Sequence, residues 1–374
     1  MLRCPFTSGS TRKMSVHTNT LTLSEQLTAA LGSLRAGGMP FVATPAAMRL
    51  EHDLVPFGGD DARERGGPNI THLEGTLLSI IPIPTTRPSE AIWRVRYFLD
   101  GVQRTLPIGW CGMNALALVV VVAGVIERRP QDGVFRAVPG MTRIASSIIL
   151  ASATNDALAD DLYDAFTRTG LAVQTADAAP TGTPHDGDFI ALQSRIRPVV
   201  SSVREMCEHT VLQAWDERTD GSEGWLIMDG SLTRADIGNA VGLIKRHSRF
   251  DLTNAEMTDL LRMPVGHRSS AFQRDVSGGL RPITWYLRLH EATGADPLFG
   301  LARIEAPSQT ANPSDYDALS HLIFSERTPR ATNDDRWPTL LYPIHIAERI
   351  LKVKLERALL GVPAALRRYL REVA

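Results

Sequence analysis

The chain has 374 residues, of which 43% are hydrophobic and 22% are charged, and its formal net charge at pH 7 is −1. This composition is typical of a soluble globular protein with a substantial core, and it excludes a global attraction to nucleic acid, so any such surface must be local. The three cysteines, Cys4, Cys111 and Cys207, contain no CxxC pair, which excludes a disulfide framework and a cysteine zinc site and favours a reducing cytoplasm.

No segment of the sequence is predicted to enter a membrane. The most apolar stretch, "ALALVVVVAGVI" (115–126), is too short to cross a bilayer and is rich in β-branched residues, so we expect a buried strand there. The amino terminus carries Arg3, Arg12 and Lys13 but no apolar signal-peptide core behind them. We therefore expect a cytoplasmic protein without a membrane partner.

The apolar residues follow a strand period in the first part of the chain and alternate between strand and helix periods later. Residues 1–20 are polar and rich in Ser and Thr, and we expect them to be frayed. In chain order, the other expected elements are a helix over 23–35, a charged loop over 51–72, strands over 75–84, 92–100, 103–110, 115–126 and 141–152, a helix over 155–170, a linker over 175–188, a helix over 189–217, strands over 225–229, 283–289 and 298–306, and a helix over 343–372 interrupted at 361–363. This order indicates an α/β fold with a mixed sheet.

Two of the expected strands end on an Asp-Gly pair. "YFLDG" ends with Asp100 and Gly101, and "LIMDG" ends with Asp229 and Gly230. Either pair alone is ordinary turn chemistry, because Asp and Gly both tolerate turn geometry. Together they suggest two carboxylates that rigid strands fix at the edge of the sheet, with each glycine letting the backbone turn away.

A third acid lies on the helix expected over 189–217. Glu208 adjoins the apolar face of this helix, and it is either a solvated helix carboxylate or an acid directed towards Asp100 and Asp229. Carboxylates that converge repel each other unless a cation neutralises them, and hard oxygen ligands favour Mg²⁺ or Mn²⁺ over zinc. A pair of such ions is a usual means of cleaving a phosphodiester.

Basic residues follow the second Asp-Gly pair. "AVGLIKRHSRF" supplies Lys245, Arg246, His247 and Arg249, which either hold a phosphate backbone or lie at a solvated helix or strand end. Arg268, beside two serines in "GHRSSAF", is a further candidate for a phosphate contact.

The last helical pattern adds two candidates. His345 and Glu348, in "YPIHIAERI", are three residues apart and share a helix face. Either one is a candidate for a late metal ligand or a proton carrier. From Arg349 onwards the pattern is basic and amphipathic, which is more typical of a packing or partner surface than of a DNA reader.

In this order the motifs resemble the NurA family of DNA-repair nucleases, whose fold is RNase H-like. The resemblance covers about residues 75–360 and is carried by "YFLDG", "REMCEH", "LIMDGSLT", "VGLIKRHS", "MPVGHRSSAF", "LARIEAP" and "YPIHIAERI". It implies a mixed β-sheet flanked by helices. The corresponding division is an N-terminal extension (1–73), a nuclease domain (74–360) and a basic helical tail (361–374).

The resemblance also implies roles for single residues. RNase H-like folds place acids on the first strand, on a helix, on the fourth strand and on a terminal helix, and these positions correspond to Asp100, Glu208, Asp229 and Glu348. Asp100 would bridge two metal ions, Glu208 and Asp229 would complete their shells, and Lys245 would hold a phosphate near the scissile bond.

The activity implied by the family is a Mn²⁺-dependent (or Mg²⁺-dependent) 5′→3′ exonuclease on single- and double-stranded DNA, with an endonuclease activity on single strands left open. The family works as a homodimer with a HerA-type hexameric ATPase, and together they resect the ends of double-strand breaks. DNA and the ATPase are therefore the expected partners.

Two departures from the family pattern keep other interpretations open. Val102 follows the first Asp-Gly pair where the family usually has serine, and Glu348 stands where His or Asp is more common, so the last ligand is Glu348 or His345. One alternative is a catalytically inactive RNase H-like module that docks on an ATPase or on DNA. A guide-dependent nuclease of the Argonaute type would need a pocket for a guide's 5′ phosphate and more chain, and we find neither in the sequence.

Overall fold

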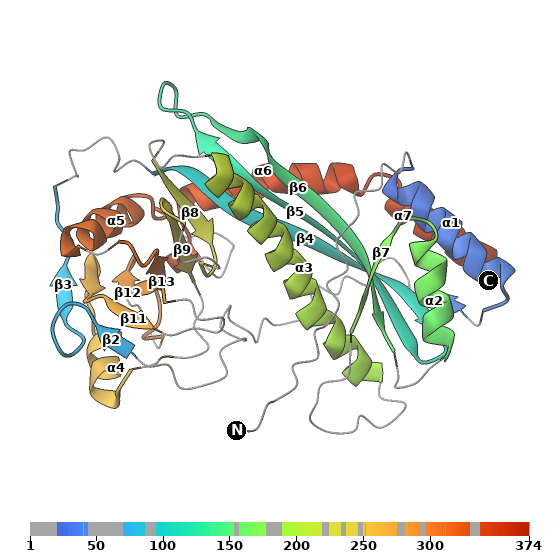
Figure 1. The fold of residues 1–374 in the computed structure, drawn as a ribbon, viewed down its shortest axis with the longest axis horizontal. Helices are drawn as coiled ribbons and strands as arrows, with labels where there is room; N and C mark the ends of the chain where they lie inside the picture. The colour runs from blue at the N-terminus through green and yellow to red at the C-terminus, as the bar shows by residue number, and fades with distance from the viewer. Residues whose placement is uncertain are drawn as a thin grey trace, which may run out of the picture.

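The computed structural model describes residues 21–39, 41–43, 70–86, 95–152, 157–176, 189–218, 224–232, 237–245, 250, 252–274, 281–291, 296–310, 312–329 and 337–373. In these residues thirteen strands form one mixed sheet, and helices cover both of its faces (Figure 1). The fold is therefore mixed α/β, as the order of the expected elements predicts.

The strands are β1 (Phe41–Ala43), β2 (Ile70–His72), β3 (Ile80–Pro82), β4 (Val95–Cys111), β5 (Asn114–Arg128), β6 (Phe135–Ala151), β7 (Ala172–Thr175), β8 (Trp225–Asp229), β9 (Ala240–Ile244), β10 (His267–Ser269), β11 (Phe272–Arg274), β12 (Ile283–Arg288) and β13 (Leu301–Ala306). Their main order across the sheet is β2-β11-β12-β13-β9-β8-β4-β5-β6-β7, with β1 beside β4, and with β10 between β12 and β3.

The helices are α1 (Leu23–Ala36), α2 (Ala157–Thr167), α3 (Phe189–Arg218), α4 (Asn254–Leu261), α5 (Pro313–Ser325), α6 (Tyr342–Ala358) and α7 (Val362–Val373), with a short 3-10 helix at Trp337–Thr339. Within the part of the chain that the structure describes, no helix is both long and apolar enough to cross a membrane.

The centre of the molecule is the antiparallel meander β4-β5-β6. β5 is buried along almost its whole length because helices pack on both faces of the meander. The apolar side of α3 packs with Leu99 and Val121 on one face, whereas α6 packs with Phe98 and Val122 on the other. In Figure 1, α3 crosses the meander on the near side and α6 lies behind it.

The meander continues into the second half of the sheet through parallel strands. β8 pairs parallel to β4, and β9 pairs parallel to β8. β13 and β12 then continue the sheet in antiparallel pairing, with α5 beside them at the left of Figure 1. The carboxyl end of β8 therefore lies near the middle of the sheet.

The described parts of the first 73 residues join the main domain. α1 packs against α2 and α7 at the end of the sheet beside β7, β1 pairs with β4, and β2 pairs with β11. The described part of the tail is helical as expected (α7, Val362–Val373), and Val362 and Leu366 are buried in the same core. The described parts of the extension and of the tail thus pack with the rest of the sheet and its helices.

Most of the expected long elements are confirmed, including the helix over 189–217 (α3) and the strand over 115–126 (within β5). The break that we expected at Asp100-Gly101 is wrong, because β4 runs without interruption through both residues. The strand expected over 75–84 is reduced to β3, and the loop expected over 51–72 ends in β2. The expected linker over 175–188 lies mostly outside the described residues.

Candidate functional site

Asp100 and Asp229 lie on neighbouring parallel strands. In the pairing of β4 with β8, Leu99 is opposite Met228, so the two aspartates that follow them are neighbours. Asp100 is 4% exposed. Because side chains alternate along a strand, Asp100 lies on the same face as Phe98 and therefore on the side of α6. The structure thus brings the two predicted carboxylates together from positions far apart in the chain.

The sheet opens beside these carboxylates. β8 ends at Asp229, whereas β4 continues to Cys111 and pairs with β1 only from Gly109 onwards. Over residues 100–108, none of the strands that the structure describes pairs with this edge of β4. In open α/β sheets, ligands bind outside the carboxyl ends of the parallel strands. The opening next to Asp100 and Asp229 is such a place.

The electrostatics of Asp100 show which groups surround it. Burial raises the pKa of Asp100 to about 7, and the negative charges of Asp229 and Glu348 also raise it. The ammonium group of Lys245 and a 2.7 Å hydrogen bond from the Gly101 N–H act in the opposite direction. Charged side chains from β8, the end of β9 and α6 therefore act on the Asp100 carboxyl of β4.

Lys245 contacts Asp229 directly. Leu243 is paired with Asp229, and two residues later the Lys245 Nζ lies 2.7 Å from Asp229 Oδ2. The Lys245 side chain is 6% exposed and that of Asp229 is 19% exposed, so the ion pair is largely shielded from water. The phosphate-binding role of Lys245 stays a prediction, and in this structure its charge is directed to Asp229.

Glu348 reaches the site from α6, and the predicted alternative, His345, lies one turn earlier. Glu348 is 19% exposed and pairs with Lys352 at 2.8 Å, and its charge acts on Asp100. His345 is partly buried, and its Nδ1 has no hydrogen-bond partner among the described residues. The structure therefore connects Glu348 with Asp100 and gives no comparable interaction for His345.

Glu208 approaches β4 from the opposite face. Its side chain is buried against Gly101, where a Cβ atom would overlap the Glu208 carboxylate. Arg204, one helical turn earlier, lies 3.6 Å from the same carboxylate. The interpretation of Glu208 as a solvated helix carboxylate is wrong. The glycine after Asp100 provides space for Glu208, whereas Gly230 (φ +120°) is the one that turns the backbone.

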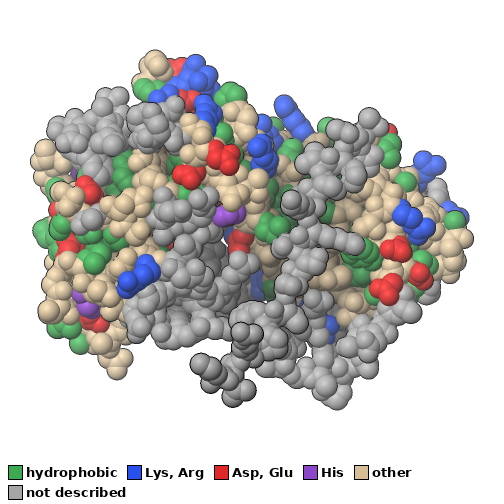
Figure 2. Space-filling model, in the orientation of Figure 1, with side chains coloured by type: hydrophobic (Ala, Val, Ile, Leu, Met, Phe, Trp, Pro, Cys, Tyr) green, Lys and Arg blue, Asp and Glu red, His purple; other side chains and the backbone are tan. Residues whose placement is uncertain are grey.

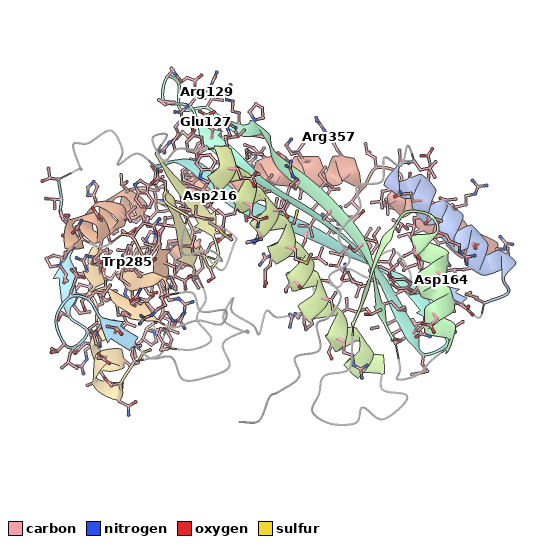
Figure 3. All side chains as sticks on the ribbon, viewed as in Figure 1. Glu127, Arg129, Asp164, Asp216, Trp285 and Arg357 are labelled. Atoms are coloured by element: carbon pink, nitrogen blue, oxygen red, sulfur yellow. The ribbon has the colours of Figure 1, made fainter. Side chains whose placement is uncertain are left out.

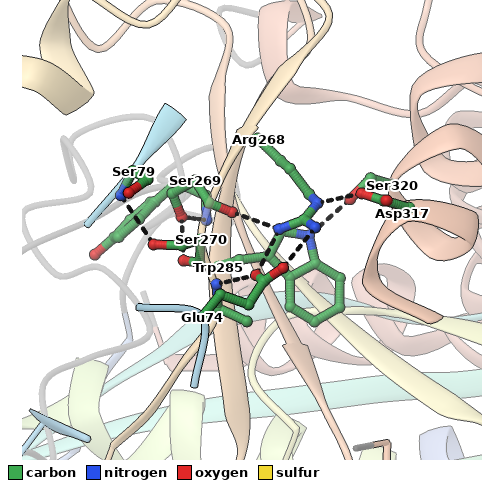
Figure 4. A network of polar contacts seen from close by, with 10 residues as sticks. Glu74, Ser79, Arg268, Ser269, Ser270, Trp285, Asp317 and Ser320 are labelled. Carbon is green, nitrogen blue, oxygen red and sulfur yellow. Dashed lines mark hydrogen bonds and ion pairs between the residues drawn. The ribbon is translucent and has the colours of Figure 1, made fainter. Parts of the chain in front are cut away.

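Arg268 is not a surface contact for phosphate. Its side chain is 1% exposed, and its guanidinium lies between the carboxylates of Glu74 and Asp317, at 2.7 Å from each (Figure 4). Glu74 also accepts a hydrogen bond from the Ala271 N–H. Arg268 therefore joins β10, α5 and the segment before β3 in the interior, which corrects its prediction as a DNA-binding residue.

Arg246 and Arg249, the other predicted DNA contacts, lie outside the described residues. Basic side chains gather at the projecting tip of the β5–β6 hairpin (Figure 2), where Figure 3 labels Glu127 and Arg129. Arg129 pairs with Asp132, and Glu127 accepts from both Arg96 and Arg136. The charges at this tip are therefore largely matched within the hairpin region.

The side chains of the site are of the chemical type that binds a divalent cation. Asp100, Asp229, Glu348 and Glu208 all offer carboxylate oxygens, which Mg²⁺ and Mn²⁺ prefer, and a cation near Asp100 would offset the burial and the repulsion that raise its pKa. Among the described residues, however, no three His, Cys, Asp or Glu side chains gather closely enough to hold a metal ion. Here Lys245 supplies the positive charge beside Asp229.

In comparisons with known proteins, no family model matches the chain, and no curated protein matches it. The likeness to NurA therefore rests on the motifs in the sequence, and a functional assignment rests on the geometry of the site.

Proposed function

We propose that the chain is a metal-dependent deoxyribonuclease whose site is built around Asp100 and Asp229. One observation carries the proposal: these two carboxylates are neighbours on parallel strands, and the charges of Glu348 and Lys245 act on the same buried carboxyl group. Converging oxygen ligands that need a cation are what metal-assisted phosphodiester hydrolysis requires.

The order of the acids along the chain supports an RNase H-like fold. If the short strands β1, β2, β3 and β7 are left out, Asp100 lies on the first of the remaining strands of the sheet and Asp229 on the fourth. Glu208 lies on the helix between the third and fourth strands, and Glu348 lies on a late helix that packs on the meander. This order agrees with the arrangement that the NurA resemblance implies.

Asp100, Asp229 and Glu348 are the residues that would hold the metal, and they would have to move closer together on binding it, since they do not gather closely enough in this structure. Glu208 would approach from the other side of β4. Bound Mn²⁺ or Mg²⁺, two ions in the mechanism that the resemblance implies, would activate water and stabilise the leaving oxygen. The protein's own contribution is to fix the carboxylates on rigid strands and to keep Asp100 out of water.

Lys245 has two tasks in this proposal. Without metal, its ammonium group neutralises Asp229 at 2.7 Å. With metal on the carboxylates, the same ammonium group is available to hold a phosphate of the substrate, as a point charge next to the scissile bond.

We propose DNA as the substrate, 5′→3′ degradation as the polarity, and a homodimer with a HerA-type ATPase as the assembly in break-end resection, because the family resemblance implies them.

The test is cleavage of end-labelled linear single- and double-stranded DNA by the purified protein with Mn²⁺, Mg²⁺ or EDTA, with and without a HerA-type ATPase. Asp229→Ala removes a central carboxylate. Asp164→Asn is the matched control, because Asp164 is an exposed acid on α2 far from the site (Figure 3). We expect metal-dependent cleavage by the wild type and by Asp164→Asn, and its loss in Asp229→Ala.

The second candidate is an inactive module that docks on an ATPase or on DNA. The direct Lys245–Asp229 pair favours it, since an ammonium group can replace the metal permanently. Binding of DNA or of the ATPase without cleavage, under every metal condition and with the ATPase present, would select this function over the nuclease.

A further inference from the structure

The loop that follows Asp229 is held by a carboxylate from another part of the sheet. Glu305, on β13, accepts hydrogen bonds from the Ser231 hydroxyl at 2.7 Å and from the Leu232 N–H at 2.9 Å. Both donors bind the same oxygen, Oε2. Since β9 lies between β8 and β13, the contact spans a whole strand.

Gly242 on β9 lets the loop lie close enough for this contact. Glu305 is paired with Gly242, and a Cβ atom at Gly242 would lie 2.6 Å from the Gly230 carbonyl oxygen and 2.8 Å from the Leu232 nitrogen. Gly230 has φ +120°, a conformation that favours glycine. The loop is thus pressed onto β9 at a position without a side chain, with its donors directed to Glu305.

Two arginines lie beside the Glu305 carboxylate. Its side chain is 1% exposed, and its Oε1 lies 3.2 Å from an Arg303 nitrogen and 3.7 Å from an Arg274 nitrogen. Glu305 therefore binds two donors of the loop through one oxygen, while its other oxygen lies near two guanidinium groups.

The segment that follows Asp229 is therefore held at three consecutive residues. The Gly230 N–H, immediately after Asp229, donates to the Leu243 carbonyl at 2.9 Å, and Ser231 and Leu232 are held by Glu305. We propose that Glu305 is a positioning residue for Asp229, which holds this carboxylate beside Asp100, where a divalent cation would bind. This inference rests on the proposed nuclease function.

A merely structural role for Glu305 makes a different prediction. If Glu305 only satisfies buried donors, its loss lowers stability but leaves cation binding by the folded protein unchanged. If it positions Asp229, its loss weakens cation binding and turnover in protein that is still folded, because partners behind metal ligands typically contribute 10–100-fold.

The experiment compares Ser231→Ala and Glu305→Gln with Glu256→Gln as a matched control. Glu256 is another buried glutamate in the same half of the molecule, but it bonds to Thr253, Leu78 and His72 instead of the Asp229 loop. Ser231→Ala deletes one hydroxyl only, so it decides the question if Glu305→Gln fails to fold. Mn²⁺ binding is measured by electron paramagnetic resonance on protein whose fold is verified by circular dichroism.

We expect Glu305→Gln to weaken Mn²⁺ binding by about tenfold or more and to lower kcat on DNA with little change in KM, and Ser231→Ala to do the same to a smaller extent. Glu256→Gln should bind Mn²⁺ like the wild type. Wild-type affinity and kcat in folded Ser231→Ala and Glu305→Gln would overturn the positioning role and leave the nuclease proposal standing. Absence of Mn²⁺ binding by the wild type would overturn the metal centre itself, and the positioning role with it.

Discussion

The Lys245 ammonium group lies 2.7 Å from Asp229 Oδ2, and this contact joins the end of β9 to the end of β8 beside the buried carboxyl of Asp100. One cation thus offsets several negative charges that meet at the opening of the sheet. Since a divalent metal would do the same, the stability of the site and its capacity for metal are linked through this lysine.

Lys245→Met should lower the free energy of unfolding by about 3 kcal/mol, because removal of one partner from a largely buried ion pair leaves an uncompensated charge. The measurement is urea denaturation in EDTA. Saturating Mn²⁺ or Mg²⁺ should restore more stability to Lys245→Met than to the wild type, since the metal replaces the missing cation.

Lys352→Met is the matched control for this loss. Lys352 also pairs with a carboxylate of the site, Glu348, but its side chain is 59% exposed. An exposed pair contributes little, so we expect a loss below about 1 kcal/mol. Equal losses of stability in the two variants would contradict the conclusion that the buried Lys245–Asp229 pair contributes more than the exposed Lys352–Glu348 pair.

The pH dependence of the unfolding free energy should reveal the raised pKa of the buried Asp100 carboxyl. Its pKa is raised to about 7 in the folded protein, whereas an unfolded aspartate has a pKa of about 3.9. The folded state therefore binds more protons between these values, and the Asp100 contribution to stability is present below about pH 4 and lost as the pH rises through about 7. The slope from this one group is at most about 1.4 kcal/mol per pH unit.

Asp100→Asn isolates that contribution, because the amide has a similar shape and does not titrate. Denaturation of the two proteins in EDTA across pH 4 to 8 should give a difference in unfolding free energy that falls with pH through this window. A difference that is flat, or that rises with pH, would contradict a raised pKa at Asp100. Saturating Mn²⁺ should reduce the slope, since a cation favours the ionised form.

The long elements could be predicted from the sequence because their patterns are local. The apolar run of β-branched residues in β5 is typical of a buried strand, and the apolar face of α3 is typical of a packed helix. The break expected at Gly101 was wrong for a reason that lies elsewhere in the chain: the space that the glycine provides is filled by Glu208 from α3. The α4 helix, by contrast, has a capping box from Thr253 to Glu256, a local signal that could have predicted it.

The candidate site was predictable only in part. Two Asp-Gly pairs suggested convergence, but the β4–β8 register that makes Asp100 and Asp229 neighbours is a long-range pairing with no local signal. The burial of Arg268 has no local signal either, because its partners, Glu74 and Asp317, are distant in sequence. Glu305 was missed for the same reason, since its contact with Ser231 crosses a strand.

Arg268→Met should reduce stability and leave DNA binding unchanged. Without this guanidinium, the Glu74 and Asp317 carboxylates have no cation to pair with in a partly buried place. The free energy of unfolding should therefore fall by about 3–5 kcal/mol. DNA affinity of protein that is verified as folded, measured at several salt concentrations, should keep the wild-type value and slope. A smaller salt slope with unchanged stability would return Arg268 to the DNA interface.

Gly101→Ala should destabilise the protein by about 1–3 kcal/mol, because its Cβ would overlap the Glu208 carboxylate and overpacking in a core has this cost. Backbone strain is not the cause, since Gly101 is not among the glycines with positive φ. Glu208→Ala removes the atoms in conflict, so Gly101→Ala combined with Glu208→Ala should lose clearly less stability than the sum of the two single losses. Additive losses in this double-mutant cycle would mean that the two residues do not touch, and that Glu208 does not reach β4 beside Asp100.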